Sequence, residues 1–283
     1  MLIVSFNGAG KSTLAKLLTR LANVTGGELL VNDVDVKRYD PATLRRYIAV
    51  LFQDIGQYHG LTILENIGVG KVADLNSTSV VHQSASDAGA AEFIDQLPYK
   101  YDSFLGFLPG EKSYGWGVGR WEDSDSGSDD EDEEKKAEKD KVQKNLSGGQ
   151  WQKIALARAF MRGNEADLLV LDEPTTNLDP EAEYKLFETI KRLRKGRTTV
   201  YISHRFNTVR AADRIMVMEK GEVKEFGTHD ELMSMKDGRY HRLYTLQAKG
   251  FLLDDKGGVS KDVDGLIVDV KEDVIQTVIN VSE

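Results

Sequence analysis

The sequence predicts an α/β protein with a mostly parallel sheet flanked by helices, an inserted helical subdomain and a small antiparallel β portion. Along most of the 283 residues, short apolar runs alternate with amphipathic helical patterns, as in a parallel sheet that is covered on both faces. Helical patterning from about residue 84 to 162 interrupts this alternation. Alternating apolar residues around Lys220-Gly221 add an antiparallel hairpin from Arg214 to Phe226.

Strands are expected at the short apolar runs that are bounded by loop-forming residues. They are Leu2–Ser5, Ile48–Phe52, Leu168–Leu171 and Thr198–Ile202. Helices are expected where apolar residues recur at helical spacing, and the shortest of them has Asp40 as its N-cap and Pro41 in its first turn. They are Lys11–Leu21, Pro41–Arg46, Ser84–Leu97, Ser147–Met161, Pro180–Arg194 and Tyr240–Gln247.

Acidic residues are concentrated in one segment of the chain. The net charge is −9, and residues 122–141 hold 11 acidic and 4 basic residues, so this segment carries −7 and the rest carries −2. Such a block has few apolar groups to bury, and we expect a disordered insert within the helical subdomain. Residues 1–249 are expected to form one domain, and residues 250–283 a C-terminal tail to which the sequence assigns no role.

Several classes of site are excluded by what the chain lacks. It has no Cys, which removes disulfides, thiolate metal sites and cysteine nucleophiles, and its five His show no metal-ligand spacing. No apolar run approaches the roughly 18 residues of a membrane-spanning helix. The charge pattern has no basic footprint, so we expect no nucleic-acid partner.

A phosphate-binding loop is predicted at Ser5-Phe6-Asn7-Gly8-Ala9-Gly10-Lys11-Ser12-Thr13, between the first strand and the first helix. Backbone N–H groups and the helix N-terminus would surround an anion, Lys11 would reach the outer phosphates, and the Ser12 hydroxyl would bind Mg2+. Ser5 stands where the G-x-x-x-x-G-K-[ST] pattern has its first glycine, and a plain glycine turn before a helix is the alternative. The loop indicates a P-loop NTPase fold.

Two carboxylates follow the apolar run Leu168–Leu171, which suits a strand buried on both faces. At the carboxyl end of a parallel strand, Asp172 and Glu173 would project into the crevice where ligands bind. We assign Asp172 to hold Mg2+ through water and Glu173 to polarise the attacking water. The alternative is a strand that enters a turn before Pro174.

The most specific motif is Asn145-Leu146-Ser147-Gly148-Gly149-Gln150, followed by a predicted helix. With the phosphate loop before it and the Asp-Glu strand after it, the chain resembles the nucleotide-binding (ATPase) domain of ABC transporters from Leu2 to about Gln247. The ending Gly227-Thr228-His229-Asp230-Glu231-Leu232, with the helix after it, is similar to the exporter-type branch related to multidrug and peptide exporters.

The resemblance implies which residues bind ATP and Mg2+. Ser147 and its glycines would cap the γ-phosphate of ATP held by the opposite subunit, Gln53 would sense Mg2+, Asp179 would link the two sites, and His204 would touch the γ-phosphate. The plain alternatives are a surface residue for Gln53, a helix N-cap for Asp179 and a structural histidine for His204. The catalytic residues would be Glu173, His204 and Lys11; the nucleotide ligands Asn7, Gly8, Ala9, Gly10, Lys11, Ser12, Thr13, Gln53, Ser147, Gly148, Gly149, Gln150 and Asp179; and the Mg2+ ligands Ser12, Gln53 and Asp172.

The resemblance further implies an ATPase that powers export through a head-to-tail nucleotide-sandwich dimer. Its partners would be a second ABC ATPase domain, identical or related, and transmembrane domains supplied elsewhere. They would hold the chain at the cytoplasmic side of a membrane, and without them it would be soluble. Family members carry upstream strands with an aromatic residue that stacks on adenine, so we expect an N-terminally truncated domain. The alternatives are a truncated regulatory or inactive module that binds nucleotide or partners without driving transport, and a soluble ABC protein of DNA repair or translation, which the exporter-like ending disfavours.

Overall fold

A computed structural model describes residues 1–5, 9–106, 142–143, 146–163, 165–193, 196–203 and 212–254, with the backbone alone at 4–5, 142–143 and 247–254. The predicted insert at 122–141 and the tail from 255 to 283 lie outside these residues. The chain divides into two compact units. The first holds Met1–Gln53, Ala166–Glu173 and Arg194–Glu283, and the second holds Asp54–Glu165 and Pro174–Leu193.

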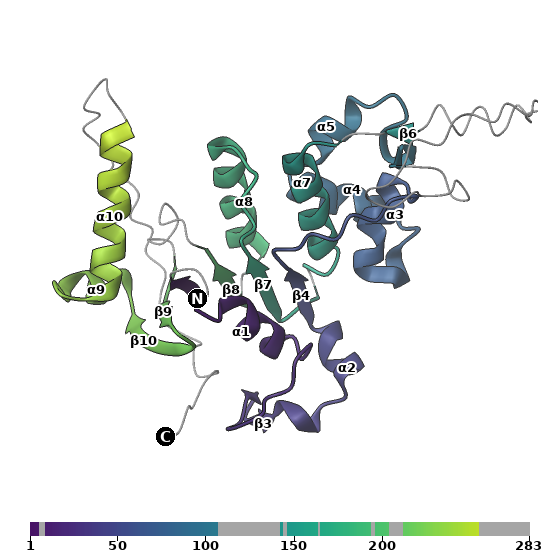
Figure 1. The fold of residues 1–283 in the computed structure, drawn as a ribbon. Helices are drawn as coiled ribbons and strands as arrows, with labels where there is room; N and C mark the ends of the chain where they lie inside the picture. The colour runs from purple at the N-terminus through teal and green to yellow at the C-terminus, as the bar shows by residue number, and fades with distance from the viewer. Residues whose placement is uncertain are drawn as a thin grey trace, which may run out of the picture. The chain divides into compact units, whose positions relative to one another are not determined.

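The first unit is built on a six-stranded sheet with the strand order β10-β9-β1-β8-β7-β4 (Figure 1). Every neighbouring pair is parallel except β9 and β10, which form the expected antiparallel hairpin. The mostly parallel α/β fold is therefore confirmed. The strands are β1 (Leu2–Ser5), β4 (Ile48–Leu51), β7 (Leu168–Asp172), β8 (Thr198–Ile202), β9 (Ile215–Glu219) and β10 (Glu222–Gly227).

The core of the first unit joins the sheet to helix α1 (Lys11–Leu18) and to the short helix α2 (Pro41–Arg46). Buried residues of the strands, such as Val170 and Val200, pack in one cluster with Ala15 and Leu18 of α1. Helix α1 ends before the expected Leu21 because Arg20 adopts a left-handed backbone with φ of 52°. Helix α2 begins as expected, since Asp40 Oδ2 accepts a hydrogen bond from Thr43 N at 2.8 Å.

A small hairpin of β2 (Leu30–Val31) and β3 (Val34–Asp35) follows α1 in the chain, and a 3-10 turn, η1 (Val36–Arg38), follows it. The sequence pattern did not indicate this hairpin. Each strand is only two residues long, and periodicity cannot be recognised over so short a stretch.

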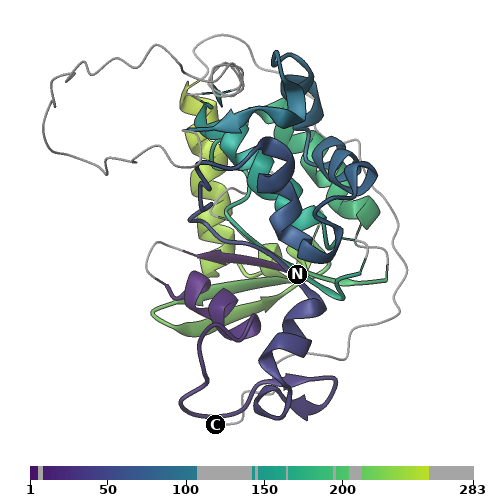
Figure 2. The same ribbon diagram turned by 90° about the vertical axis from the view of Figure 1, so that its right-hand side faces the viewer.

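The second unit is mainly helical, and α7 (Gly148–Phe160) packs against α3 (Ile63–Gly68), η2 (Val69–Asp74) and α4 (Thr78–Asp87) (Figure 2). The helix expected at Ser84–Leu97 is instead two helices, α4 and α5 (Ala91–Asp95), because Gly89 between them has φ of 66°. The expected domain boundaries stay a prediction. The remaining elements are η3 (Lys100–Asp102), β5 (Phe104–Leu105), β6 (Val142–Gln143) and α8 (Pro180–Leu193).

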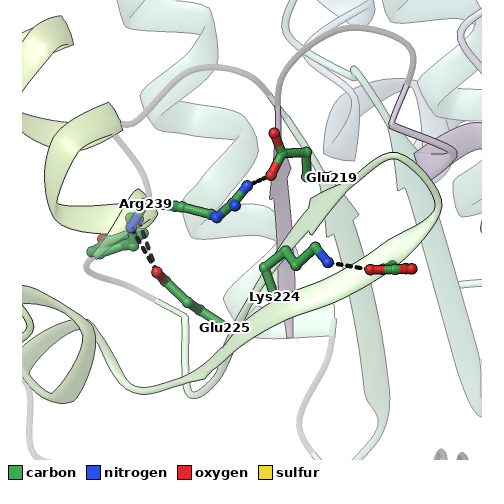
Figure 3. Close-up of polar contacts among 6 residues, drawn as sticks. Glu219, Lys224, Glu225 and Arg239 are labelled. Carbon is green, nitrogen blue, oxygen red and sulfur yellow. Dashed lines mark hydrogen bonds and ion pairs between the residues drawn. The ribbon is translucent and has the colours of Figure 1, made fainter. Parts of the chain in front are cut away.

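The first unit ends with α9 (His229–Ser234) and α10 (Arg239–Asp254), the second of which is longer than expected. Glu225 on β10 caps α10 from outside the helix, accepting hydrogen bonds from Arg239 N at 2.6 Å and Tyr240 N at 2.9 Å (Figure 3). The Arg239 side chain also forms an ion pair with Glu219 of β9. Across the described part of the chain, no helix combines the length and apolarity needed to span a membrane.

Candidate functional site

The carboxyl end of β7 carries the two predicted acidic residues in the first unit. Asp172 is the last residue of the strand and only 1% exposed, and Glu173, which follows it, is 8% exposed. Glu173 has a left-handed backbone with φ of 52°, and its N–H donates to the Ile202 carbonyl at 2.9 Å. A non-glycine residue held in this region costs about 1–3 kcal/mol, and such strain is concentrated at functional positions.

The Asp172 carboxylate is buried, and no described residue donates a hydrogen bond to it. A buried carboxylate in this condition is costly unless a cation balances it, and oxygen ligands of this kind suit Mg2+. No group of three or more His, Asp or Glu that could hold a metal ion occurs in the described residues. Asp172 therefore fits a magnesium ion that takes its other ligands from a hydroxyl, water and phosphate oxygens.

Lys11 lies at the start of α1, in the same unit, and is 9% exposed. Burial lowers the pKa of its ammonium group, while the nearby charges of Glu173 and Asp172 act in the opposite direction. The side chain thus brings a desolvated positive charge toward the two carboxylates. A polyanion such as a triphosphate is the ligand that this combination of cation and metal-binding carboxylate suits.

The backbone before Lys11 has the shape of a loop that requires glycine. Gly10 is the N-cap of α1 with φ of 95°, and its Cα region lies against Gly221 in the β9–β10 turn. The Ala9 carbonyl accepts a hydrogen bond from Gly221 N at 3.1 Å. The hairpin turn therefore supports the described half of the phosphate loop. Of the other predicted loop residues, Asn7 and Gly8 lie outside the described residues.

The structure places the remaining described residues that were predicted to bind metal or phosphate at two element ends in the first unit. Ser12 and Thr13 are in the first turn of α1, where Ser12 is half-buried and Thr13 exposed. Gln53 is exposed and lies two residues beyond the end of β4. Their roles stay predictions. His204 directly follows the last described residue of the β8 segment and lies outside the described residues.

The second unit carries the motif residues Ser147–Gln150, called the signature residues below, at the N-terminus of α7, which is called the signature helix. Ser147 caps the helix with its side-chain oxygen, which accepts from Gln150 N at 3.2 Å. In return, Gln150 Oε1 accepts from Ser147 N at 2.8 Å. This reciprocal capping box holds an exposed helix N-terminus whose first residues are Gly148 and Gly149, so its N–H groups can approach an anion.

The loop that contains Asn177 packs against this helix start, in the same unit. A side chain added at Gly149 would lie 2.7 Å from the Asn177 carbonyl oxygen, so only glycine allows the approach. Asp179 caps α8, since its Oδ1 accepts from Ala182 N at 2.8 Å. That hydrogen bond is the main cause of the lowered pKa of Asp179. The expected alternative of an N-cap is therefore found, and the link of Asp179 to a second site stays a prediction.

Sequence reasoning missed a contact that involves Gln152 on the signature helix. This buried side chain donates from Nε2 to the Pro174 carbonyl at 3.1 Å, and Pro174 directly follows Glu173 in the chain. The signature helix thus holds the backbone immediately after the acidic pair. A glutamine inside a helical pattern gives no signal of this role, because its partner is a backbone atom about twenty residues away.

Comparisons with known proteins agree with this geometry. The family described as ABC transporter matches residues 1–176. The subtilin transport ATP-binding protein SpaT of Bacillus subtilis is 40% identical over 232 residues, covering 82% of this chain and 32% of that protein. The ATP-dependent lipid A-core flippase of Chromohalobacter salexigens is 39% identical over 246 residues, covering 87% of this chain and 35% of that protein.

A solved structure is also similar. A bacterial Atm1-family ABC exporter with ATP bound superposes with a TM-score of 0.69 and 29% identity, covering 87% of this chain and 36% of the exporter chain. The chain thus spans about a third of the length of the proteins it matches. The sequence resemblance is confirmed, and so is the mostly parallel P-loop fold. The chain therefore belongs to the ABC transporter family, and it carries the exporter-type ATP-binding domain.

Proposed function

We propose that this chain binds and hydrolyses MgATP and that hydrolysis powers export through membrane domains on other polypeptide segments. The observation that carries the proposal is the end of β7. There, a buried Asp172 to which no described residue donates a hydrogen bond and a strained Glu173 lie close enough to Lys11 to influence its pKa. The desolvated Lys11 beside the carboxylate of Asp172 is suited to bind the phosphate groups of MgATP, and the carboxylate of Glu173 is suited to activate water.

Each of these residues has a distinct role in the proposed reaction. Lys11 neutralises charge that develops on the outer phosphate oxygens, and Glu173 orients the attacking water and accepts its proton. Asp172 and Ser12, with Gln53, would hold Mg2+, which supplies electrostatic stabilisation of the phosphate oxygens when bound. The described backbone N–H groups of Ala9 and Gly10 and the Thr13 hydroxyl add donors to the phosphates. His204, Asn7 and Gly8 keep their predicted roles.

We further propose that the complete site is shared between two chains. The phosphate-side residues Lys11, Asp172 and Glu173 belong to the first unit, and the signature residues Ser147–Gln150 belong to the second. Each group presents an anion-binding feature of its own, a glycine-opened loop in the first and an exposed, capped helix N-terminus in the second. A head-to-tail pair of identical or related chains would place one group of each chain on either side of an ATP molecule.

The proposed export role is supported by the names of the relatives. Their names describe a transport ATP-binding protein, a lipid A-core flippase and an ABC exporter, each about three times as long as the matched region. We propose that transmembrane domains of this kind bind the present chain at the cytoplasmic face of a membrane. The substrate would be selected by those domains and not by the residues described here.

Complementation between inactive variants tests the shared site. Lys11→Ala and Ser147→Arg chains, each inactive alone, should regain activity when they are mixed, because each mixed dimer keeps one intact composite site. About a quarter of the parent rate is expected for random pairing of two chains with equivalent sites. The matched control mixes Lys11→Ala with Glu173→Gln, which lie in the same group and should not complement. Equal rates in both mixtures would refute a shared site.

A further inference from the structure

The guanidinium of Arg158 joins the signature helix to the chain segment that follows Gln53. Arg158 lies eleven residues after Ser147, about 16 Å along α7 at 1.5 Å per residue. Its Nε donates to the Asn66 carbonyl at 2.9 Å, and one terminal nitrogen donates to Asn66 Oδ1 at 3.2 Å. The other terminal nitrogen donates to the Gly56 carbonyl at 3.0 Å, three residues beyond Gln53.

Asn66 extends this contact over the whole segment of residues 56–62. It is fully buried, and its side-chain amide donates to the Tyr58 carbonyl at 2.9 Å and to the Thr62 carbonyl at 3.2 Å. The Arg158 guanidinium also lies 4.3 Å from the centre of the Tyr58 ring, within the range of a cation–π contact. Arg158 therefore holds both Gly56, at the start of the segment, and Asn66, in the helix α3 that follows the segment.

The partners of Arg158 are unusual for a charge that is withdrawn from water. Its described contacts are carbonyl oxygens and an aromatic ring, and none of the ion pairs found among the described residues includes it. Burial lowers its pKa, although a guanidinium stays charged at any physiological pH. A planar group with several fixed donors can hold three separated acceptors, which a lysine cannot do.

We propose that Arg158 is a positioning residue that makes residues 56–62 and the signature helix move as one body, so that nucleotide bound near Gln53 sets the position of Ser147. The inference rests on the proposed function and extends it to a residue that touches neither ATP nor Mg2+. Arg162 offers an internal comparison. It lies four residues after Arg158, two residues beyond the end of α7, and donates to the Gly70 carbonyl at 2.8 Å, which is a contact with η2 and not with the segment after Gln53.

Steady-state kinetics of the 283-residue chain separate positioning from general stability. For Arg158→Ala, kcat should fall by about 10- to 100-fold, the loss expected when a catalytic group is displaced by about 1 Å. The Kd for MgATP, measured by titration calorimetry in a Glu173→Gln background, should change by no more than about two-fold, because the phosphate loop lies in the other unit. Arg162→Ala should leave both constants within about three-fold of the parent.

Arg158→Lys keeps the charge and covers the case in which the alanine variant does not fold. It should unfold near the parent temperature and still lose at least about five-fold in kcat, since one ammonium cannot satisfy the Gly56 and Asn66 oxygens together. A lysine variant with parental kcat would overturn the proposal. So would equal losses in Arg158→Ala and Arg162→Ala, because these would indicate a purely structural effect.

Hydrogen exchange gives a readout that does not depend on turnover. At chain concentrations where sedimentation shows monomers, MgATP should alter amide exchange at residues 146–150 in the Glu173→Gln chain. This response should vanish with Arg158→Ala and persist with Arg162→Ala. A response that survives in Arg158→Ala, or that is missing from the Glu173→Gln chain itself, refutes the inference. A chain that shows the response but never hydrolyses ATP would contradict the proposed function alone.

Discussion

Replacing Gly149 by alanine would place a methyl group 2.7 Å from the Asn177 carbonyl oxygen. Ordinary contact of such a carbon begins at 3.4 Å, so the helix start or the Asn177 loop must shift by about 0.7 Å. Overpacking of this kind costs about 1–3 kcal/mol. Gly148 is the matched control, because a methyl group there would meet the Asn177 side chain at an ordinary 3.7 Å. Both glycines lie in the first turn of α7, so the gain in helix propensity is similar in the two variants and cancels in their difference.

Thermal unfolding without nucleotide measures this difference. The Gly149→Ala chain should unfold about 2–12 °C below the Gly148→Ala chain, at 2–4 °C per kcal/mol for a protein of this size. Hydrogen exchange should report the displacement directly, with faster exchange at residues 175–179 in Gly149→Ala alone. Equal unfolding temperatures for the two variants would refute the argument that the Asn177 carbonyl requires glycine at position 149.

Three further outcomes follow from individual carboxylates. Glu173→Gln should abolish ATP hydrolysis while MgATP binding persists. A variant that hydrolyses ATP at the parental rate would refute the assignment of Glu173 as the residue that activates water. Glu225→Ala should lower the free energy of unfolding by about 0.5–2 kcal/mol through loss of the α10 cap, whereas Glu222→Ala, on the same strand, should stay within about 0.5 kcal/mol in a denaturant titration. The pKa of Asp40 is lowered mainly by the hydrogen bond from Thr43 N, so its stabilising effect is present above about pH 3.9 and is lost as the pH falls through the lowered pKa. Asp40→Asn keeps an N-cap acceptor that does not titrate, and the melting-temperature advantage of the parent over it should shrink from pH 6 to pH 3; an advantage that is constant with pH would contradict this.

The strands and the start of α1 after a glycine-containing loop could be predicted because their signals are local. An apolar run that ends in Asp172-Glu173, or a glycine loop before Lys11, is recognisable within about ten residues of sequence. Contacts between distant segments gave no such signal. The cap that Glu225 provides for α10 and the hydrogen bonds of Arg158 to Gly56 and Asn66 join residues far apart in the chain. A side chain whose partner is a backbone carbonyl leaves no residue pair to recognise in a single sequence.

Helix boundaries could be predicted only where the residue type by itself indicates them. The cap at Asp40 was expected from residue type, and the structure has it. The capping box of Ser147 with Gln150 was not named in advance, although it too joins residues only three positions apart. The break between α4 and α5 was missed, although it lies at Gly89 with φ of 66°. Glycine inside a helical pattern is compatible with a continuous helix, and only the backbone angle shows that the chain turns there.

The backbone conformation of Glu173 is a further feature that could not be inferred from the residue type. Sequence reasoning placed a carboxylate at the end of a buried strand, where strand alternation alone would send Asp172 and Glu173 to opposite faces. The left-handed φ of 52° interrupts that alternation immediately after Asp172, while the Ile202 carbonyl still accepts the Glu173 N–H. At the next residue in the chain, the Pro174 carbonyl accepts a hydrogen bond from Gln152 of the signature helix. The strained residue is thus fixed by hydrogen bonds at its own N–H and at the following carbonyl, so a conformation that costs about 1–3 kcal/mol persists where the proposed reaction needs both carboxylates.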